Sequence, residues 1–292
     1  MLGTALRQAL EARDDVVLQL VRRDPEAAGQ IEWDPIALAP VADTRSLEGM
    51  AAAIHLSGAN VAAHRWTPHY KREMWLSRVE STRVLATMLA SLRQPPKTLL
   101  VASATGVYGN RGEEVLDESS QPGAGFLADL CREWEAAARP AAEAGIRVVN
   151  LRFGVVLGPG PGALTKMLPL FRLGLGGRLG SGRQWMSCIG LADAVAAILF
   201  AVNAVELAGP VNLTAPHPVT NAEFARSLGL AVHRPAVVSA PAFALRLALG
   251  AMADEALLAS ARVFPAKLAK LGFRFTYPTV DSALAAALAG KR

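Results

Sequence analysis

The sequence predicts an α/β protein built on a doubly wound parallel sheet, with a smaller and mostly helical C-terminal part. Three observations predict this fold class. Short apolar runs, typical of strands covered on both faces, alternate with helical patterns through the first half of the chain. Polar or glycine-bearing segments follow these runs, as they follow the strands of open α/β sheets. Glycine- and proline-rich stretches and then helical patterns fill the second half.

The first half alternates helix and strand in order, which predicts parallel strands with helices on both faces of the sheet. The expected helices cover residues 2–13, 69–92 and 126–143. The expected strands cover residues 16–21, 52–56, 98–102 and 147–151.

The second half begins with glycine-rich stretches at 158–162 and 174–182, typical of a substrate-side segment. Residues 185–189 are expected to return to the sheet, followed by a helix at 191–202 and a strand at 211–213. From residue 218 the pattern is mostly helical. We therefore expect residues 1–157, joined by 185–205, to form the core. Residues 158–184 and 206–292 should form a cap within the same compact body.

Composition limits the class of protein. Apolar residues make up 52% of the chain and charged residues only 19%, yet the longest apolar stretches are interrupted by Arg246, Asp193 or Asn203. No membrane span and no signal peptide are expected, so the cytoplasm is the expected location. Cys131 and Cys188 are too few for a disulfide framework or a zinc site and should be buried thiols, and no metal site is expected.

The chain is basic, with a net charge of +5 and a pI near 9.6. The Arg and Lys residues are dispersed among acids, so a nucleic-acid partner is not expected. A solvated surface with a few phosphate-directed arginines explains the charge better. In an open α/β sheet the ligand lies at the carboxyl ends of the strands, which directs attention to Arg22, Ser57, Ser103 and Arg152.

An ordered series of short segments resembles a known family. The segments are 55–60 (HLSGAN), 65–67 with Lys71, 77–79 with Thr82, 103–109 (SATGVYG), 126–128 with Trp134 and Glu135, 151–158 (LRFGVVLG), 174–177, 180–182, 212–216, and 272–273 with 277–278. Across nearly the whole chain they resemble the atypical, extended short-chain dehydrogenase/reductases, of the NAD-dependent epimerase/dehydratase-like type with uncertain substrate. The resemblance implies a Rossmann-like sheet that binds a dinucleotide.

The family opens with a strand and a loop patterned Gly-x-x-Gly-x-x-Gly, whose backbone approaches the pyrophosphate at a helix N-terminus. Only Gly3 matches this loop, so roughly ten residues, including the first strand, are expected to be missing relative to the fold's usual layout. A start codon assigned too far downstream would explain this. This explanation is preferred over a genuine short form that binds nucleotide poorly, and the codons upstream decide between the two.

Arg22 and Arg23 follow the second strand of this layout, where an acid would accept the ribose hydroxyls of NAD. Two guanidinium groups suit a 2′-phosphate, which predicts NADP rather than NAD, although they are also typical surface charges. Leu56, Ser57 and Gly58 should let the backbone pass close to the cofactor, or else form a simple tight turn.

The later part of the family pattern adds further candidates. Arg152 and Gly154 are expected on the nicotinamide side, with a structural ion pair as the alternative for Arg152. Lys71 and Arg78 face either a ligand phosphate or solvent, and Asp193 is expected to be the N-cap of the helix that follows it.

The expected catalytic residues are Ser103, Thr105 and Tyr108, in the segment where the superfamily places its catalytic hydroxyl. Alignment on Tyr108 puts Ala104 at the usual hydroxyl position, so the assignment among them stays open. The superfamily's Tyr-x-x-x-Lys pair, which exchanges a proton with substrate, is missing. Leu127 and Cys131 take its two positions if Glu135 matches the family's helix glutamate.

Two functions therefore remain open. The chain is either an NADP-dependent oxidoreductase or sugar-nucleotide epimerase-like enzyme acting on an unidentified small molecule, or a nucleotide-binding or sensing protein without catalysis. A third hypothesis is a scaffold that no longer binds a dinucleotide. The apolar helices also offer faces for a homodimer.

Overall fold

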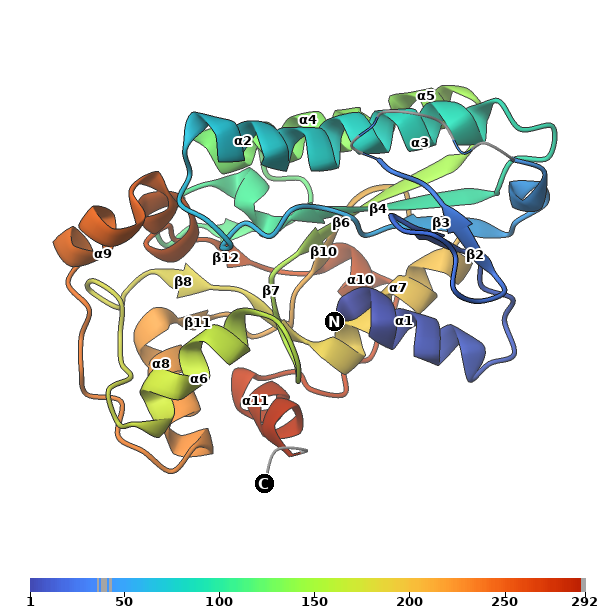
Figure 1. The fold of residues 1–292 in the computed structure, drawn as a ribbon. Coiled ribbons are helices and arrows are strands. Elements are labelled where there is room, and N and C mark those ends of the chain that lie inside the picture. The colour runs from blue at the N-terminus through green and yellow to red at the C-terminus, as the bar shows by residue number, and fades with distance from the viewer. Residues whose placement is uncertain (36, 38–40, 42–43, 290–292) are drawn as a thin grey trace.

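The computed structural model describes residues 1–35, 37, 41 and 44–289. Its centre is a four-stranded parallel sheet in the order β10-β6-β4-β3, shown in Figure 1. The strands are β3 (Ala52–His55), β4 (Thr98–Ala104), β6 (Arg147–Phe153) and β10 (Gly209–Leu213). Each lies where the sequence predicts a strand, and β4 and β6 run two residues further than expected.

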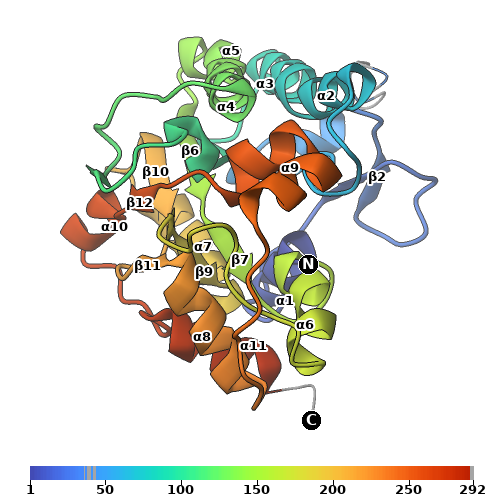
Figure 2. The ribbon, with the colours of Figure 1, turned by 90° about the vertical axis from the view of Figure 1, so that its left-hand side faces the viewer.

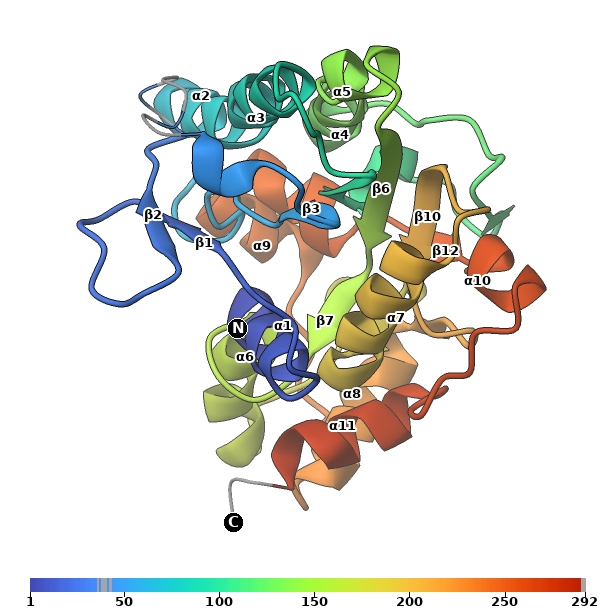
Figure 3. The same cartoon turned by 90° about the vertical axis from the view of Figure 1, so that its right-hand side faces the viewer.

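Helices cover both faces of this sheet, as Figure 3 shows, which confirms the doubly wound arrangement. One face carries α2 (Pro68–Trp75), the π-helical η2 (Leu76–Glu80), α3 (Ser81–Ala90), α4 (Phe126–Ala136) and α5 (Arg139–Glu143). The other face carries α1 (Leu2–Glu11) and α7 (Leu191–Asn203). Because side chains alternate along a strand, Leu99 and Val101 of β4 pack into the first core while Leu100 packs into the second.

Two short strands near the N-terminus form a sheet of their own. β1 (Gln19–Val21) pairs in parallel with β2 (Gln30–Glu32), and among the described residues neither strand is hydrogen-bonded to the central sheet. The expected strand at 16–21 is too long at its start, because Val16 is 83% exposed and outside any ladder.

The expectation that residues 185–189 return to the central sheet is wrong. They form β8 (Trp185–Met186) and β9 (Cys188–Gly190), which pair with β11 (Val219–Thr220) and β7 (Val155–Leu157) in two small separate sheets. The chain leaves the central sheet at Gly154, where the backbone of Ser187 lies too close for any side chain.

The remaining elements complete the fold, and several of them lie beside these small sheets, as Figure 2 shows. They are η1 (Arg45–Leu47), η3 (Thr105–Tyr108), β5 (Val115–Leu116), α6 (Ala163–Arg172), α8 (Asn221–Ala231), α9 (Ala242–Leu249), η4 (Ala253–Leu257), β12 (Arg262–Val263), α10 (Ala266–Lys270) and α11 (Val280–Leu288). The mostly helical C-terminal part is thus confirmed, while the division into core and cap stays a prediction. Within the described ranges, no helix combines the length and apolarity that crossing a bilayer requires.

Asp193 is not the N-cap of α7, because that position belongs to Gly190. The carboxylate of Asp193 is buried in the first turn and accepts hydrogen bonds from the backbone N–H groups of Thr276 and Tyr277, each at 2.8 Å. It therefore fixes the turn before α11. Cys131 and Cys188 are buried free thiols, as expected, and burial raises the pKa of each to about 12.

Candidate functional site

Several predicted site residues lie in the segments that follow parallel strands, whereas Ser103 and Arg152 lie within the ends of β4 and β6, and Gly3 lies in α1. Arg22 follows β1, Ser57 follows β3, and Thr105 follows β4. Because β3, β4 and β6 are parallel, their carboxyl ends share one edge of the sheet, where ligands of open α/β sheets bind.

The two predicted phosphate-binding arginines differ in their surroundings. Both are exposed, but Arg23 forms an ion pair with Glu26, whereas Arg22 has no hydrogen bond or ion pair with any described residue. Arg22 is therefore the guanidinium that is available to an anion.

Gly3 lies in the first turn of α1, whose N-cap Met1 makes no side-chain capping bond. A Cβ at Gly3 would meet nothing within 4 Å, so its backbone is open to a ligand. Uncapped amides at a helix N-terminus suit an anion.

Two side chains of η2 hold the loop after β3 in place by hydrogen bonds to Ala59. Ser77 accepts a hydrogen bond from the N–H of Ala59 at 3.0 Å, and Arg78 donates to the carbonyl of Ala59 at 2.7 Å. Arg78 is buried against the Trp134 ring, so the expectation that it faces solvent is wrong, while its contact with a ligand phosphate stays a prediction. A Cβ at Gly58 would lie 3.0 Å from its guanidinium carbon, so glycine lets the loop pass over this arginine with Ser57 exposed.

A buried polar network underlies the end of β4. Arg152 of β6 donates from Nε and Nη2 to the two carboxylate oxygens of Glu135, each at 2.8 Å, and from Nη1 to the Tyr108 hydroxyl at 3.0 Å. Ser103 donates to the same carboxylate at 2.7 Å. Burial by itself lowers the pKa of Arg152, but the hydrogen bonds and charge of Glu135 raise it above its usual value. Arg152 is thus held by protein groups, as the structural alternative expects.

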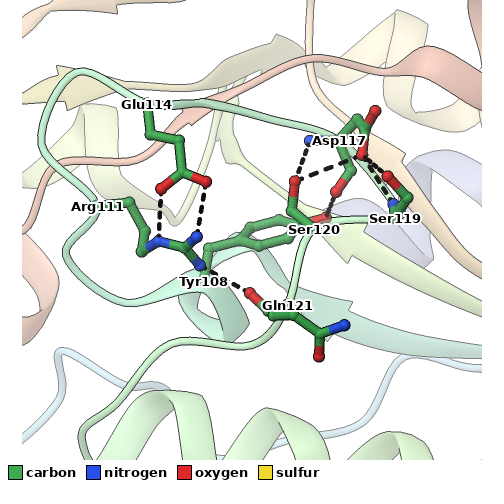
Figure 4. Close-up of polar contacts among 7 residues, drawn as sticks. All are labelled: Tyr108, Arg111, Glu114, Asp117, Ser119, Ser120 and Gln121. Carbon is green, nitrogen blue, oxygen red and sulfur yellow. Dashed lines mark hydrogen bonds and ion pairs between the residues drawn. The ribbon is translucent and has the colours of Figure 1, made fainter.

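Tyr108 is fully buried, at 0% exposure. Its hydroxyl donates to the carbonyl of Asp117 at 2.9 Å or to Oδ1 of Asn212 at 2.7 Å, and burial raises the pKa of the phenol. Figure 4 shows the ring between the bidentate Arg111–Glu114 pair and the turn around Asp117.

Thr105 is the half-buried member of the three predicted catalytic residues. It begins η3 directly after β4, and its hydroxyl makes no hydrogen bond with a described residue. Gly106 follows, and a Cβ there would contact Leu127 at 3.5 Å and the Cys131 sulfur at 3.9 Å. Leu127 and Cys131 therefore face this segment from α4, at the place expected for the missing tyrosine and lysine.

The other predicted residues have structural contacts. Gly154 donates its N–H to Leu213 at 3.1 Å, and a Cβ at Gly154 would lie 2.3 Å from the Ser187 carbonyl. Leu56 is half-buried and packs on both hydrophobic cores. Among the described residues, no cluster of His, Cys, Asp or Glu could hold a metal ion.

Three residues that shape this region are not among those expected from the sequence. Asn212 and Glu118 are buried and join the network around Tyr108, with Glu118 accepting the Asn212 N–H at 3.0 Å. Glu255 reaches the start of α4 from η4, 128 residues further along the chain. No local pattern reports contacts of such long range, whereas an ion pair of Arg152 with an acid, its partner unnamed, was one of the two expectations for that residue.

Two cavities of the described structure bear on the site. One of about 540 Å³ lies between α1, α7 and α11 and is lined by apolar residues with Tyr277 as the polar exception. A second, of about 270 Å³, adjoins Gly106 and Leu127 and is lined also by charged residues of α9 and η4. The second is the cavity next to the strand-end residues.

Comparisons with known proteins agree with this architecture. The model of the NAD dependent epimerase/dehydratase family matches residues 1–213, and a domain of unknown function, DUF1731, matches residues 240–287. An epimerase family protein of Mycobacterium leprae is 45% identical over 284 residues, covering 97% of this chain and 91% of its own length.

A human relative provides both a sequence comparison and a comparison of structures. The human epimerase family protein SDR39U1 is 36% identical over 286 residues, covering 97% of this chain and 94% of its own. A crystal structure of that human protein with NADPH is similar at a TM-score of 0.89 and 34% identity, covering 98% of this chain and 95% of that chain. The chain therefore belongs to the NAD dependent epimerase/dehydratase family.

Proposed function

We propose that this protein binds NADP(H) along the carboxyl edge of its sheet and acts as an epimerase-like oxidoreductase on a small molecule. The observation that carries the cofactor preference is the exposed Arg22, which no described residue pairs. A guanidinium can form charge-assisted, bidentate hydrogen bonds to the 2′-phosphate that distinguishes NADP from NAD. The human relative whose structure contains NADPH supports the same choice.

The residues present fit a dinucleotide at several points. The open backbone at Gly3 suits the pyrophosphate, and the exposed Ser57 and Gly58 leave room beside the loop after β3. Arg78 and Ser77 hold that loop in place. When bound, the nicotinamide supplies hydride transfer to or from the substrate.

Thr105 is the hydroxyl that we assign to contact with substrate, because it is partly exposed and has no described partner. Ser103 and Tyr108 act beneath it as positioning residues. Through Glu135 and Arg152 they hold the end of β4 and the start of η3 in one geometry. Arg152 and Gly154 then shape the nicotinamide side by fixing the backbone there.

A second candidate is a nucleotide-binding or sensing protein without catalysis. Leu127 and Cys131 favour it: if Glu135 matches the family's helix glutamate, they take the positions of the superfamily's proton-transfer pair, and neither side chain performs that role. The raised pKa of the Cys131 thiol, about 12, keeps it protonated at neutral pH. Turnover of any carbonyl or alcohol substrate with NADP(H) would exclude this candidate.

The cofactor proposal is tested by substituting Arg22 with alanine and titrating the protein with NADPH and with NADH, following nicotinamide fluorescence. Loss of a charged hydrogen bond to phosphate should weaken NADPH binding about 10- to 100-fold. Binding of NADH should be unchanged, as should NADPH binding by the control Arg132→Ala, whose guanidinium is an exposed charge on α4. An R22A variant that retains the wild-type affinity for NADPH would refute the phosphate-binding role.

A further inference from the structure

The 270 Å³ cavity lies between the end of β4 and the C-terminal segment that matches the domain of unknown function. Gly106 and Leu127 form its inner wall, and Arg246, Asp254 and Glu255 bring charge to it from α9 and η4. It is therefore formed jointly by the sheet edge and by the segment without an assigned role.

Glu255 lines this cavity and also caps the N-terminus of α4 from a distant part of the chain. Its Oε2 atom accepts the N–H of Leu127 at 2.8 Å, in the first turn of α4. The N-cap of α4 is Gly125, which has no side chain to cap the helix and has a φ of 111°. A Cβ at Gly125 would lie 2.9 Å from Oε2, so the glycine makes room for the carboxylate.

One oxygen of this carboxylate is free to bind a ligand. Oε1 of Glu255 has no partner among the described residues, and it is not closed off from solvent. Asp254, in contrast, accepts a hydrogen bond from Nε of Arg246 at 2.8 Å. The cavity thus offers a hydrogen-bond acceptor beside the segment that carries Thr105.

The same arrangement disfavours an anionic ligand. A helix N-terminus ordinarily binds phosphate, but at α4 the Glu255 carboxylate already fills that role. The ionisable groups of the lining are two acids and one arginine, and the arginine is paired. The volume also lies below the range of about 300–1,000 Å³ typical of pockets for drug-sized ligands.

Resting on the proposed function, we propose that this cavity is the substrate site and that Glu255 is its recognition residue. The substrate class is a small, phosphate-free molecule that donates hydrogen bonds, such as a free sugar or polyol, rather than a nucleoside diphosphate sugar. The C-terminal segment thereby determines substrate choice, while the sheet edge holds the cofactor.

Saturation-transfer difference NMR on the intact protein saturated with NADPH tests this proposal. The probes are D-glucitol, methyl α-D-glucoside and UDP-glucose. The two neutral probes should receive saturation from the wild-type protein, and UDP-glucose should neither receive it nor displace them. The signals should fall at least threefold in Glu255→Gln, which keeps an oxygen to accept the Leu127 N–H, and should persist in the control Glu133→Gln.

The possible outcomes distinguish failure of the substrate-site proposal from failure of the proposed NADP(H)-dependent function. If Glu255 were only a helix cap, the Gln variant would retain the probe signals, and that result would overturn the proposal. Displacement of the neutral probes by UDP-glucose, or silence of all probes, would overturn it too. NADPH affinity, measured separately by fluorescence, stays at the wild-type value in E255Q. Failure of the wild-type protein to bind NADPH would instead refute the proposed function.

Discussion

At the scale of single residues, the interior contains charged and titratable groups. Whether each has a partner determines how much its burial lowers the free energy of unfolding. Arg152 and Glu135 have side chains only 7% and 13% exposed, and they meet in a bidentate pair. A buried pair contributes little net stability, but an unpaired buried charge is strongly destabilising. Ser103 and Tyr108 depend on this pair, because both hydrogen-bond to its members.

Glu135→Ala should lower the free energy of unfolding by about 3–5 kcal/mol, because Arg152 would keep its charge without a counterion. Chemical denaturation measures the change. Replacing both residues with apolar ones, Glu135→Leu and Arg152→Met, should recover a large part of the loss. A double variant less stable than E135A would show that the network, and not the unpaired charge, sets the cost.

His55 gives the protein a pH-dependent stability. Burial lowers the pKa of His55 to about 4 from its ordinary value of 6.5. Between pH 4 and pH 6.5 the imidazole of His55 is therefore protonated more readily in the unfolded chain than in the folded protein. The stability that the neutral, buried imidazole permits is complete above about pH 6.5 and is lost as the pH falls toward 4. The loss between pH 7.5 and pH 5 should be about 2 kcal/mol.

Urea unfolding at pH 7.5 and pH 5 measures this contribution. In His55→Gln the decrease in unfolding free energy should be smaller than in the wild type by about that 2 kcal/mol. The exposed His69, changed to Gln in parallel, provides the control. Identical pH dependence of H55Q and wild type would show that the imidazole does not titrate as described.

At the scale of elements, the sequence predicted the central strands well because each contains a short run of apolar residues, and β4 is buried over six of its seven residues. It failed at residues 185–189, whose apolar character is equally satisfied by small sheets beyond Gly154. It also could not separate α2, η2 and α3, since a π-helical turn keeps the helical pattern almost unchanged. Strand-end residues such as Thr105 were predictable, whereas Glu255 and Asn212 depend on tertiary packing.

Two glycines at element boundaries should respond oppositely to alanine. Gly154→Ala places a Cβ 2.3 Å from the Ser187 carbonyl and should lower the free energy of unfolding by about 1–3 kcal/mol. Gly3→Ala meets nothing within 4 Å and should raise that free energy by up to about 1 kcal/mol, because alanine favours a helix.

Gly3→Ala should nevertheless weaken NADPH binding if the pyrophosphate approaches this backbone. Thermal unfolding and fluorescence titration of the same two variants measure both effects. A G3A variant that gains stability and keeps full NADPH affinity would remove Gly3 from the cofactor site.

At the scale of the whole molecule, two parts contribute to the proposed site. The strand ends contribute the exposed Arg22 after β1, the open loop at Gly58 after β3 and the half-buried Thr105 after β4, and the C-terminal segment contributes Glu255. The family was predictable from the ordered series of short sequence segments, and the fold class was predictable from the apolar runs of the strands. The substrate was not, because its recognition depends on residues brought together only by folding. The cytoplasmic location and the homodimer stay predictions.

The preference for NADPH over NADH is tested most directly on the wild-type protein. Fluorescence titration at constant ionic strength gives the dissociation constants for NADH and NADPH, and their ratio is the quantity to compare. The free guanidinium of Arg22 predicts a ratio of about 10 or more in favour of NADPH. Equal affinity for the two cofactors, or no binding of either, would contradict the account.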